Sequence, residues 1–211
     1  MPRARPAVTA SSASSRSAAP APRGRPRSEQ ADRAILAAAL DILRDEGYRA
    51  VTIDAVAKRA GVARTTIYRR WASSASILVD VLIELGAQVA PAPAGGDPLR
   101  AIRLEMRRIA AVSSALPGQL LSAILGEAQH DAQIRHTLLD RLIYPRREAT
   151  ARMIRDAQAR GLIRDDVNAH VALDLFYGPI FYRMLMTHEP ATERFATQIF
   201  ERALAGLKPE R

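Results

Sequence analysis

The sequence predicts an all-α protein, with a small three-helix bundle near the N-terminus and a larger helical second half. Apolar residues recur at three- and four-residue intervals along most of the chain, which is the periodicity of a helix with one buried face. The second half contains no segment with the alternation of apolar and polar residues that marks a strand. Gly- and Pro-rich stretches such as residues 91–98 separate the periodic segments. At 211 residues the chain is long enough for a sizeable core, as one or two domains.

The charge of the chain is strongly positive and unevenly distributed. The net charge is +9 and the sequence pI is about 10.8, which favours a polyanionic partner. Residues 1–30 contain six arginines and one acid, whereas the rest of the chain is closer to balance. The chain has no cysteine, which excludes disulfides and thiol catalysis. No apolar run approaches the roughly 20 residues that span a bilayer, and no hydrophobic signal core is present, so we expect a cytoplasmic protein with no membrane partner.

Residues 1–27 are expected to form a disordered basic arm, because Ala, Ser, Pro and Arg offer little to bury. The arm ends in Arg-Gly-Arg-Pro, which resembles the core of an AT-hook. In an extended conformation, Arg23 and Arg25 would enter the minor groove of DNA. Two alternatives remain: a tail that is Arg-rich by composition alone, and a transit peptide, which the lack of an amphipathic helix makes the weaker of the two.

A helix is expected from the N-cap Ser28 to about Glu46, where Gly47 ends it. A shorter helix follows from Thr52 to Ala60. Thr52 is expected to cap this second helix, and Gly61 to end it in a tight bend.

A third helix starts at about Ala63, with Ile67 and Trp71 on its inner face. From Lys58 to Trp71 there are five basic residues and no acidic one. A short cationic helix with hydroxyls among its arginines can contact phosphates and base edges together, so residues 28–72 are predicted to be a helix-turn-helix DNA-binding domain. A basic helix face that is simply solvated is the alternative. The outer face carries Arg64, Thr65, Thr66, Tyr68, Arg69 and Arg70.

The remainder of the chain is predicted to be helical throughout. A connecting helix spans residues 73–90 with Ser73 as its cap, and residues 97–211 form the ligand-binding and dimerisation domain, which begins at the cap Asp97 and Pro98. The further helices are expected over Pro117–Glu127, over Asp131–Arg160 with a kink or break at Pro145, over Val167–Thr187 with an interruption at Gly178-Pro179, and from about Thr192.

Residues 97–211 offer no credible catalytic set, so no enzyme activity and no cofactor is predicted. The tightest polar cluster comprises Glu127, His130, Asp131 and His136. Glu127 and His130 are three residues apart and could reach one metal ion, but a solvated helix junction is the favoured interpretation.

Apolar and aromatic residues in the second half are candidates for a pocket that takes a hydrophobic small molecule. The alternative is that they are ordinary core or dimer-interface residues, such as Leu175, Ile180 and Phe195, since aromatics fill both settings. The candidate ligand-binding residues are Met106, Tyr144, Tyr177 and Phe181.

A three-helix N-terminal module with this sequence, a connecting helix and an all-helical remainder together resemble the tetracycline-repressor (TetR) family of transcription regulators. The specific match covers about Ser28 to Leu85 and is strongest from Thr52 to Trp71. The resemblance implies a homodimer whose C-terminal helices pair as a four-helix bundle. It also implies a small-molecule effector, whose binding tilts the connecting helix and releases a palindromic double-stranded DNA operator. By position, Arg64 and Thr65 would face bases, Thr52, Thr66 and Tyr68 would hold phosphates, and Arg69 and Arg70 could do either.

Two positions depart from the family pattern. Ala63 stands where a small hydroxyl residue often caps the recognition helix, and Ser74 stands where a lysine usually begins the fourth helix. The competing hypotheses are an all-helical enzyme or small-molecule-binding protein with an incidental basic N-terminus, and an architectural DNA-binding protein without an effector.

Overall fold

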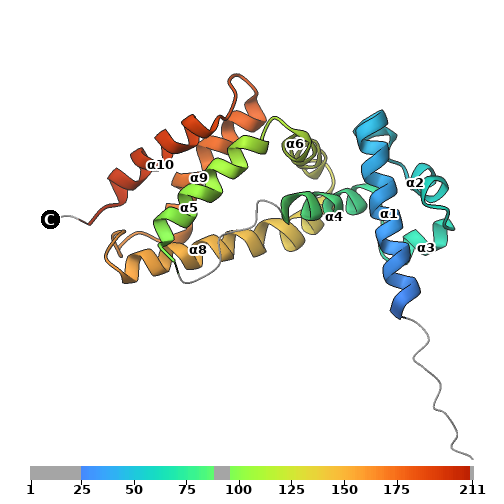
Figure 1. Cartoon of the computed structure of the whole chain (residues 1–211), viewed down its shortest axis with the longest axis horizontal. Coiled ribbons are helices and arrows are strands. Elements are labelled where there is room, and N and C mark those ends of the chain that lie inside the picture. The colour runs from blue at the N-terminus through green and yellow to red at the C-terminus, as the bar shows by residue number, and fades with distance from the viewer. Residues whose placement is uncertain (1–24, 88–95, 210–211) are drawn as a thin grey trace, which may run out of the picture.

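The computed structural model describes residues 25–87 and 96–209, which form helices and connecting loops without a β-strand. The helices near the N-terminus gather at one end of an elongated molecule, and α4 (Ser74–Gly86) leads from them into the larger helical body (Figure 1). The predicted all-α fold is confirmed.

The first helix begins earlier than the sequence predicted. Helix α1 (Arg25–Glu46) starts at Arg25 instead of at a cap on Ser28, so Arg25 lies at the start of a helix and not in an extended arm. The favourable length and periodicity of α1 let it extend past the local cap signal. Arg23 lies outside the described residues.

The helix-turn-helix follows the local signals closely. Helix α2 (Ile53–Ala60) is capped by Thr52, whose Oγ1 accepts from the backbone N–H of Ala55 at 3.1 Å. Gly61 ends it with φ of 65°, a conformation that favours glycine. A 3-10 turn, η1 (Tyr48–Ala50), joins α1 to α2.

The second half contains α5 (Pro98–Val112), α6 (Leu116–Ala128), α7 (Ala132–Leu138), α8 (Tyr144–Ala159), α9 (Ala169–Met186) and α10 (Glu193–Leu207). The kink or break predicted at Pro145 takes the form of a π-helical turn, η3 (Leu139–Ile143), which ends two residues before the proline, while the helix continues from α7 into α8. A residue without an N–H leaves an upstream carbonyl without its usual partner, and a π-helical turn accommodates this.

Helix α9 corrects another expectation. It continues through Gly178-Pro179 without interruption. Phe176, Tyr177 and Ile180, on both sides of the proline, are buried, so tertiary packing holds the helix together where local propensity would break it.

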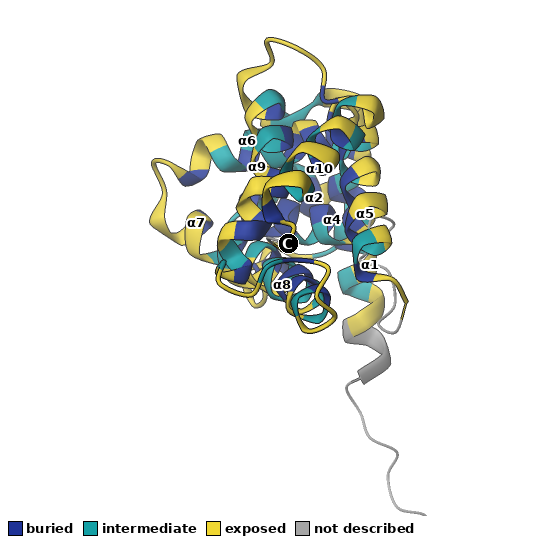
Figure 2. Ribbon diagram, turned by 90° about the vertical axis from the view of Figure 1, so that its left-hand side faces the viewer, coloured by how far each residue is buried: buried dark blue, intermediate teal, exposed yellow. Residues whose placement is uncertain are grey.

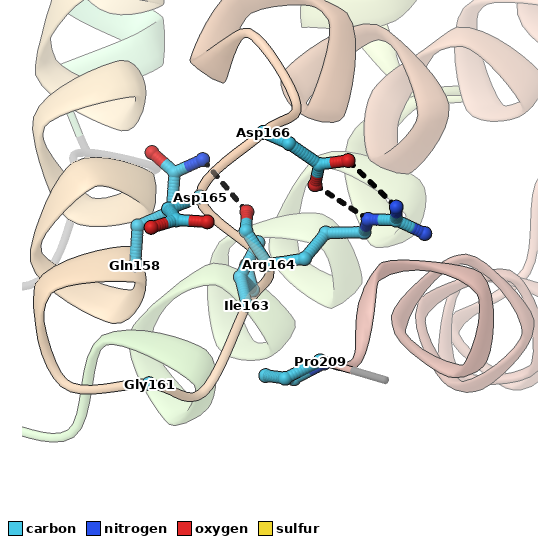
Figure 3. A pocket seen from close by; sticks show the side chains of 7 residues that line it. All are labelled: Gln158, Gly161, Ile163, Arg164, Asp165, Asp166 and Pro209. Carbon is cyan, nitrogen blue, oxygen red and sulfur yellow. Dashed lines mark hydrogen bonds and ion pairs between the residues drawn. The ribbon is translucent and has the colours of Figure 1, made fainter. Parts of the chain in front are cut away.

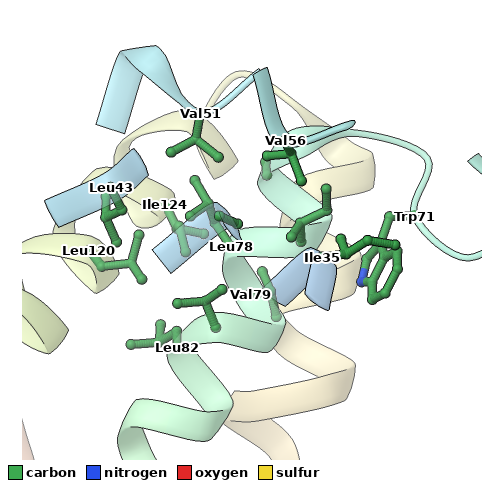
Figure 4. Packing of buried hydrophobic residues seen from close by; sticks show 14 of the residues in the cluster. Ile35, Leu43, Val51, Val56, Trp71, Leu78, Val79, Leu82, Leu120 and Ile124 are labelled. Atoms are coloured by element: carbon green, nitrogen blue, oxygen red, sulfur yellow. The ribbon is translucent and has the colours of Figure 1, made fainter. Parts of the chain in front are cut away.

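Two hydrophobic clusters form the core. The first joins α1, α2, α3 (Arg64–Tyr68) and α4 to α6, α7 and η3, so the N-terminal bundle and part of the second half share one core (Figure 4). The second cluster lies among α5, α8, α9 and α10. Figure 2 shows the buried residues along the facing sides of these helices and exposed residues on their outer sides. Most of α4 is buried, and it packs against α1, α6, α7 and η3.

No single helix in the described part of the chain is long and apolar enough to cross a membrane. The bent pair α5 and α6, at 84° to each other, meets the length and composition criteria only when taken together.

Candidate DNA-binding surface and effector cavity

Helix α3 (Arg64–Tyr68) is held in place from one side only. Ile67 is fully buried and Trp71, just after the helix, is 4% exposed, so the inner face is fixed in the core. The indole Nε1 of Trp71 also donates to Oδ2 of Asp80 on α4 at 2.7 Å. The opposite face presents Arg64, Thr65 and the half-exposed Tyr68 to solvent.

The arginines of this region differ in how firmly they are held. Arg64 pairs with Asp54 at 2.6 Å, but both side chains are more than 60% exposed, and such pairs contribute roughly 0–1 kcal/mol. A phosphate or base can therefore replace Asp54 at low cost. Arg70 pairs with Asp32, which is mostly buried on α1, so Arg70 fastens the end of the recognition region to the bundle. Among the described residues, no carboxylate pairs with Arg69, which is exposed.

The threonines occupy different settings. Thr52 is exposed, and although its Oγ1 accepts from Ala55 N–H, the hydroxyl hydrogen is available to a phosphate oxygen. Thr65 is exposed and Thr66 is half-buried. Ala63 precedes α3 and makes no side-chain capping hydrogen bond, and the N–H of Thr66 in the first turn bonds to the backbone carbonyl of Ala63 at 2.9 Å.

A cavity of about 300 Å³ lies between α5, α6, η3, α8 and α9. A smaller cavity of about 70 Å³ adjoins it and shares several of its lining residues. The volume of the larger cavity, about 300 Å³, is at the lower end of the range for small-molecule sites. The walls are mostly apolar and include Ile109, Leu121, Leu125, Leu139, Leu142, Ile143, Leu173, Phe181 and Leu185.

One wall of the cavity carries a buried polar cluster. Glu105 on α5 is 3% exposed, and its Oε2 accepts from the hydroxyl of Tyr177 at 2.6 Å. The single hydroxyl hydrogen of Thr150 can be donated either to this Oε2 at 3.4 Å or to the carbonyl of Arg146 at 3.2 Å. Burial raises the pKa of Glu105, although the Tyr177 hydrogen bond and the Arg146 charge oppose this. Burial and the neighbouring Glu105 also raise the pKa of Tyr177 well above its ordinary value.

The predicted ligand-binding residues divide into two groups. Tyr177 and Phe181 line the cavity. Met106 is fully buried in the core and Tyr144 is 55% exposed, and neither lines the cavity. Sequence reasoning missed Glu105, although one signal was present: it lies three residues after Ile102 and four before Ile109, so it falls on the apolar stripe of its helix.

The cavity is joined to the DNA-binding end by polar contacts with α4. Arg141, within η3, pairs with Asp80 at 2.6 Å, and Asp80 is the carboxylate that accepts from Trp71. Arg146, which lines the cavity, donates to the carbonyl of Gly86 at the end of α4. Arg141 and Arg146 thus link η3 and the cavity wall to α4. The contact of Arg141 extends through Asp80 to Trp71, which lies three residues after the end of α3.

A second cavity, of about 340 Å³, lies between α8 and the C-terminal end of the described chain (Figure 3). Its polar groups are bound to one another: Arg164 pairs with Asp166 at 2.6 Å, and Gln158 donates to the carbonyl of Arg164 at 3.0 Å. Few polar groups of this cavity are left to bind a ligand. One of its walls is Pro209, the last described residue, so the structure does not define the cavity beyond that point. We therefore do not assign the effector to this cavity.

Two of the four polar residues considered for a metal site, Asp131 and His136, interact with neighbouring groups of their own helix. Asp131 caps α7 by accepting from the N–H groups of Gln133 and Ile134, at 2.8 and 3.1 Å. His136 lies 3.1 Å from Asp140, one helical turn away. Within residues 25–87 and 96–209 no three potential metal ligands come together.

The fold and the exposed basic helix define a helix-turn-helix protein with a helical domain that encloses a cavity. Comparison with known proteins agrees. Residues 35–81 match the model described as "Bacterial regulatory proteins, tetR family", and residues 92–203, more than half of the chain, match "Tetracyclin repressor-like, C-terminal domain". The chain belongs to the TetR family of transcription regulators.

Individual relatives extend over nearly the whole chain. The HTH-type transcriptional regulator YdeS of Bacillus subtilis is 31% identical over 186 residues, which are 88% of this chain and 94% of YdeS. The crystal structure of the TetR family regulator SCO0332 is 28% identical with a TM-score of 0.74, covering 85% of this chain and all of that one. Thermus thermophilus FadR, a TetR family repressor in complex with lauroyl-CoA, shares the fold at 18% identity and a TM-score of 0.67, covering 85% and 96% of the two chains.

Proposed function

We propose that this protein is a homodimeric cytoplasmic repressor, with no enzyme activity, that is released from a palindromic operator by a small hydrophobic effector. The observation that carries the proposal is α3: an acid-free helix, fixed in the core through Ile67 and Trp71, whose other face is exposed and cationic. Membership of the TetR family supports it, because the family consists of DNA-binding regulators.

In the proposed complex, Arg64 and Thr65 contact base edges in the major groove. Thr52, Thr66 and Tyr68 contact phosphates, and Arg69 contributes a further cation. Arg70 is proposed to contribute charge while it remains paired with Asp32, so it acts mainly by orienting α3. Arg23 and Arg25 stay candidates for additional phosphate or minor-groove contacts.

The proposed dimer seam is an apolar stripe along the outer side of α9. Its members are about half exposed in the single chain, and a contiguous apolar surface of this kind is typically covered by a partner. A second copy of the chain would cover it about a two-fold axis. Of the three residues named from sequence, Ile180 is fully buried, Phe195 is half-buried with Arg183 over its ring at 3.5 Å, and Leu175 is the most exposed, so Leu175 is the best placed for the seam. The stripe comprises Val171, Leu175, Tyr182 and Met186.

We propose that the effector occupies the 300 Å³ cavity and displaces η3 and α8. Such a displacement would act on α4 through Arg141 and Arg146, and on the recognition region through Asp80 and Trp71. The effector shifts the balance between the DNA-bound and free forms only to the extent that it binds one of them better. Because Trp71 lies on this route and is the chain's single tryptophan, its fluorescence should report the change.

Selection of bound DNA from a random pool by the full-length protein tests the proposal. We expect two inverted half-sites whose centres are about 10 base pairs, or a multiple of this, apart, because a symmetric dimer places its two recognition helices in major grooves on one face of DNA. Recovery of a single unrepeated site, or of no preferred sequence, would contradict it.

A further inference from the structure

The cavity holds one acidic oxygen without a partner. Oε2 of Glu105 accepts from Tyr177 and Thr150, but no described residue donates a hydrogen bond to Oε1. The side chain is 3% exposed and lines the cavity. The fully enclosed side-chain atoms without a hydrogen-bond partner in the described chain do not include Oε1, so this oxygen is accessible from the cavity and can accept from a ligand that carries a donor.

Both arginines that line the same cavity have bonding partners other than Glu105, although the charge of Arg146 also acts on Glu105 and lowers its pKa. Arg147 pairs with Asp174 at 2.5 Å, so these two charges neutralise each other. Arg146 donates to the carbonyl of Gly86 and forms no ion pair with Glu105 or any other carboxylate of the described chain. A carboxylate ligand near Glu105 would meet a like charge, whereas an ammonium would meet the Glu105 oxygen and the hydroxyl oxygens beside it.

Resting on the effector site proposed above, we infer that the effector is a hydrophobic amine whose ammonium group is bound by Glu105. The apolar walls receive its hydrocarbon or aromatic body. At the packing density of protein interiors, about 300 Å³ accommodates roughly ten to fifteen non-hydrogen atoms. Tyr177, with Thr150 beside it, holds the carboxylate through Oε2, so that Oε1 is left for the ligand.

Three probes with the same apolar body separate the possible head groups: 4-phenylbutylamine, 4-phenylbutanol and 4-phenylbutyrate. Titration of the full-length protein by calorimetry should show that the amine binds at least about tenfold more tightly than the other two, since charge-assisted hydrogen bonds are about twice as strong as neutral ones. The variant Glu105→Gln keeps an acceptor for Tyr177 and should lose the preference for the amine, while its affinity for the alcohol stays within about threefold.

The variant Asp174→Asn is the matched control, because it also removes a carboxylate that lines the cavity, but an exposed one that is paired with Arg147. It should retain the preference for the amine. Equal affinities, no binding of any probe, or tightest binding of phenylbutyrate would overturn the assignment. Operator binding is measured separately: an amine that binds through Glu105 without weakening DNA binding would sustain this inference and reject the release mechanism.

Discussion

Replacing Leu175 by glutamate is expected to convert the dimer into a monomer and to weaken operator binding by about 100-fold or more. Leu175 is 50% exposed at the centre of the α9 stripe, so the single chain should tolerate the change. In the dimer, the two-fold axis would bury a glutamate from each chain without a partner, which costs several kcal/mol. Analytical ultracentrifugation measures the oligomeric state, and fluorescence anisotropy measures the affinity for the selected operator.

Leu104→Glu is the control for this substitution. Leu104 is also a partly exposed leucine, at 37%, but it lies on α5 outside the stripe. This variant should remain dimeric and bind DNA as the unsubstituted protein does. A dimeric Leu175→Glu variant with unchanged DNA affinity would show that the chains associate through another surface.

Replacing Gly118 by alanine is expected to destabilise the protein by about 3 kcal/mol or more. A Cβ at Gly118 would lie 1.9 Å from the carbonyl oxygen of Ser113, which no side-chain rearrangement can relieve because the obstacle is backbone. Ser113 is itself fixed, since its hydroxyl donates to the carbonyl of Ala110 at 2.8 Å. The turn between α5 and α6 would have to move, at the cost typical of an overpacked core. Thermal unfolding should show a loss of about 6 °C or more.

Gly126 provides a control within the same helix. A Cβ there meets nothing within 4 Å, so Gly126→Ala should raise stability by about 0.5–1 kcal/mol through the higher helix propensity of alanine. Equal thermal stability of the two variants would show that α6 approaches α5 less closely than the structure indicates.

The elements that the sequence predicted well are those set by local chemistry. Thr52, Ser73 and Asp97 each accept a hydrogen bond from the first turn of the helix that follows, as their residue types predicted. The π-helical turn before Pro145 likewise depends on the absence of one N–H group. Such features require only a few neighbouring residues, and a single sequence contains them.

The features that the sequence could not supply depend on residues far apart in the chain. The continuity of α9 through Pro179 rests on packing of its buried residues against α10 and other helices, as in the stacked rings of Phe176 and Phe200 at 5.4 Å. The pairing of Arg70 with Asp32 is also a tertiary contact, and it distinguishes an arginine that orients α3 from one that is free to bind DNA.

The candidate cavity shows the same limit. Tyr177 and Phe181 were predicted to face a ligand and do line the cavity, since residues four apart share a helix face. Glu105 was missed because its role depends on Tyr177 and Thr150, which lie 72 and 45 residues further along the chain. A single acidic residue on the apolar stripe of a helix indicates that this side chain has polar partners in the core. The tertiary structure is needed to show which residues those partners are.

The exposed face of α3 is proposed to contact the operator, and the affinity of the double variant Arg64→Ala/Tyr68→Ala for the selected DNA tests this contact most directly. Arg152→Ala, which removes an exposed arginine on α8, is the charge-matched control. We expect the double variant to remain folded and dimeric and to bind the operator about 100-fold less tightly, since a base-contacting arginine alone contributes about 1–3 kcal/mol. An operator affinity equal to that of the Arg152→Ala protein would contradict the claim.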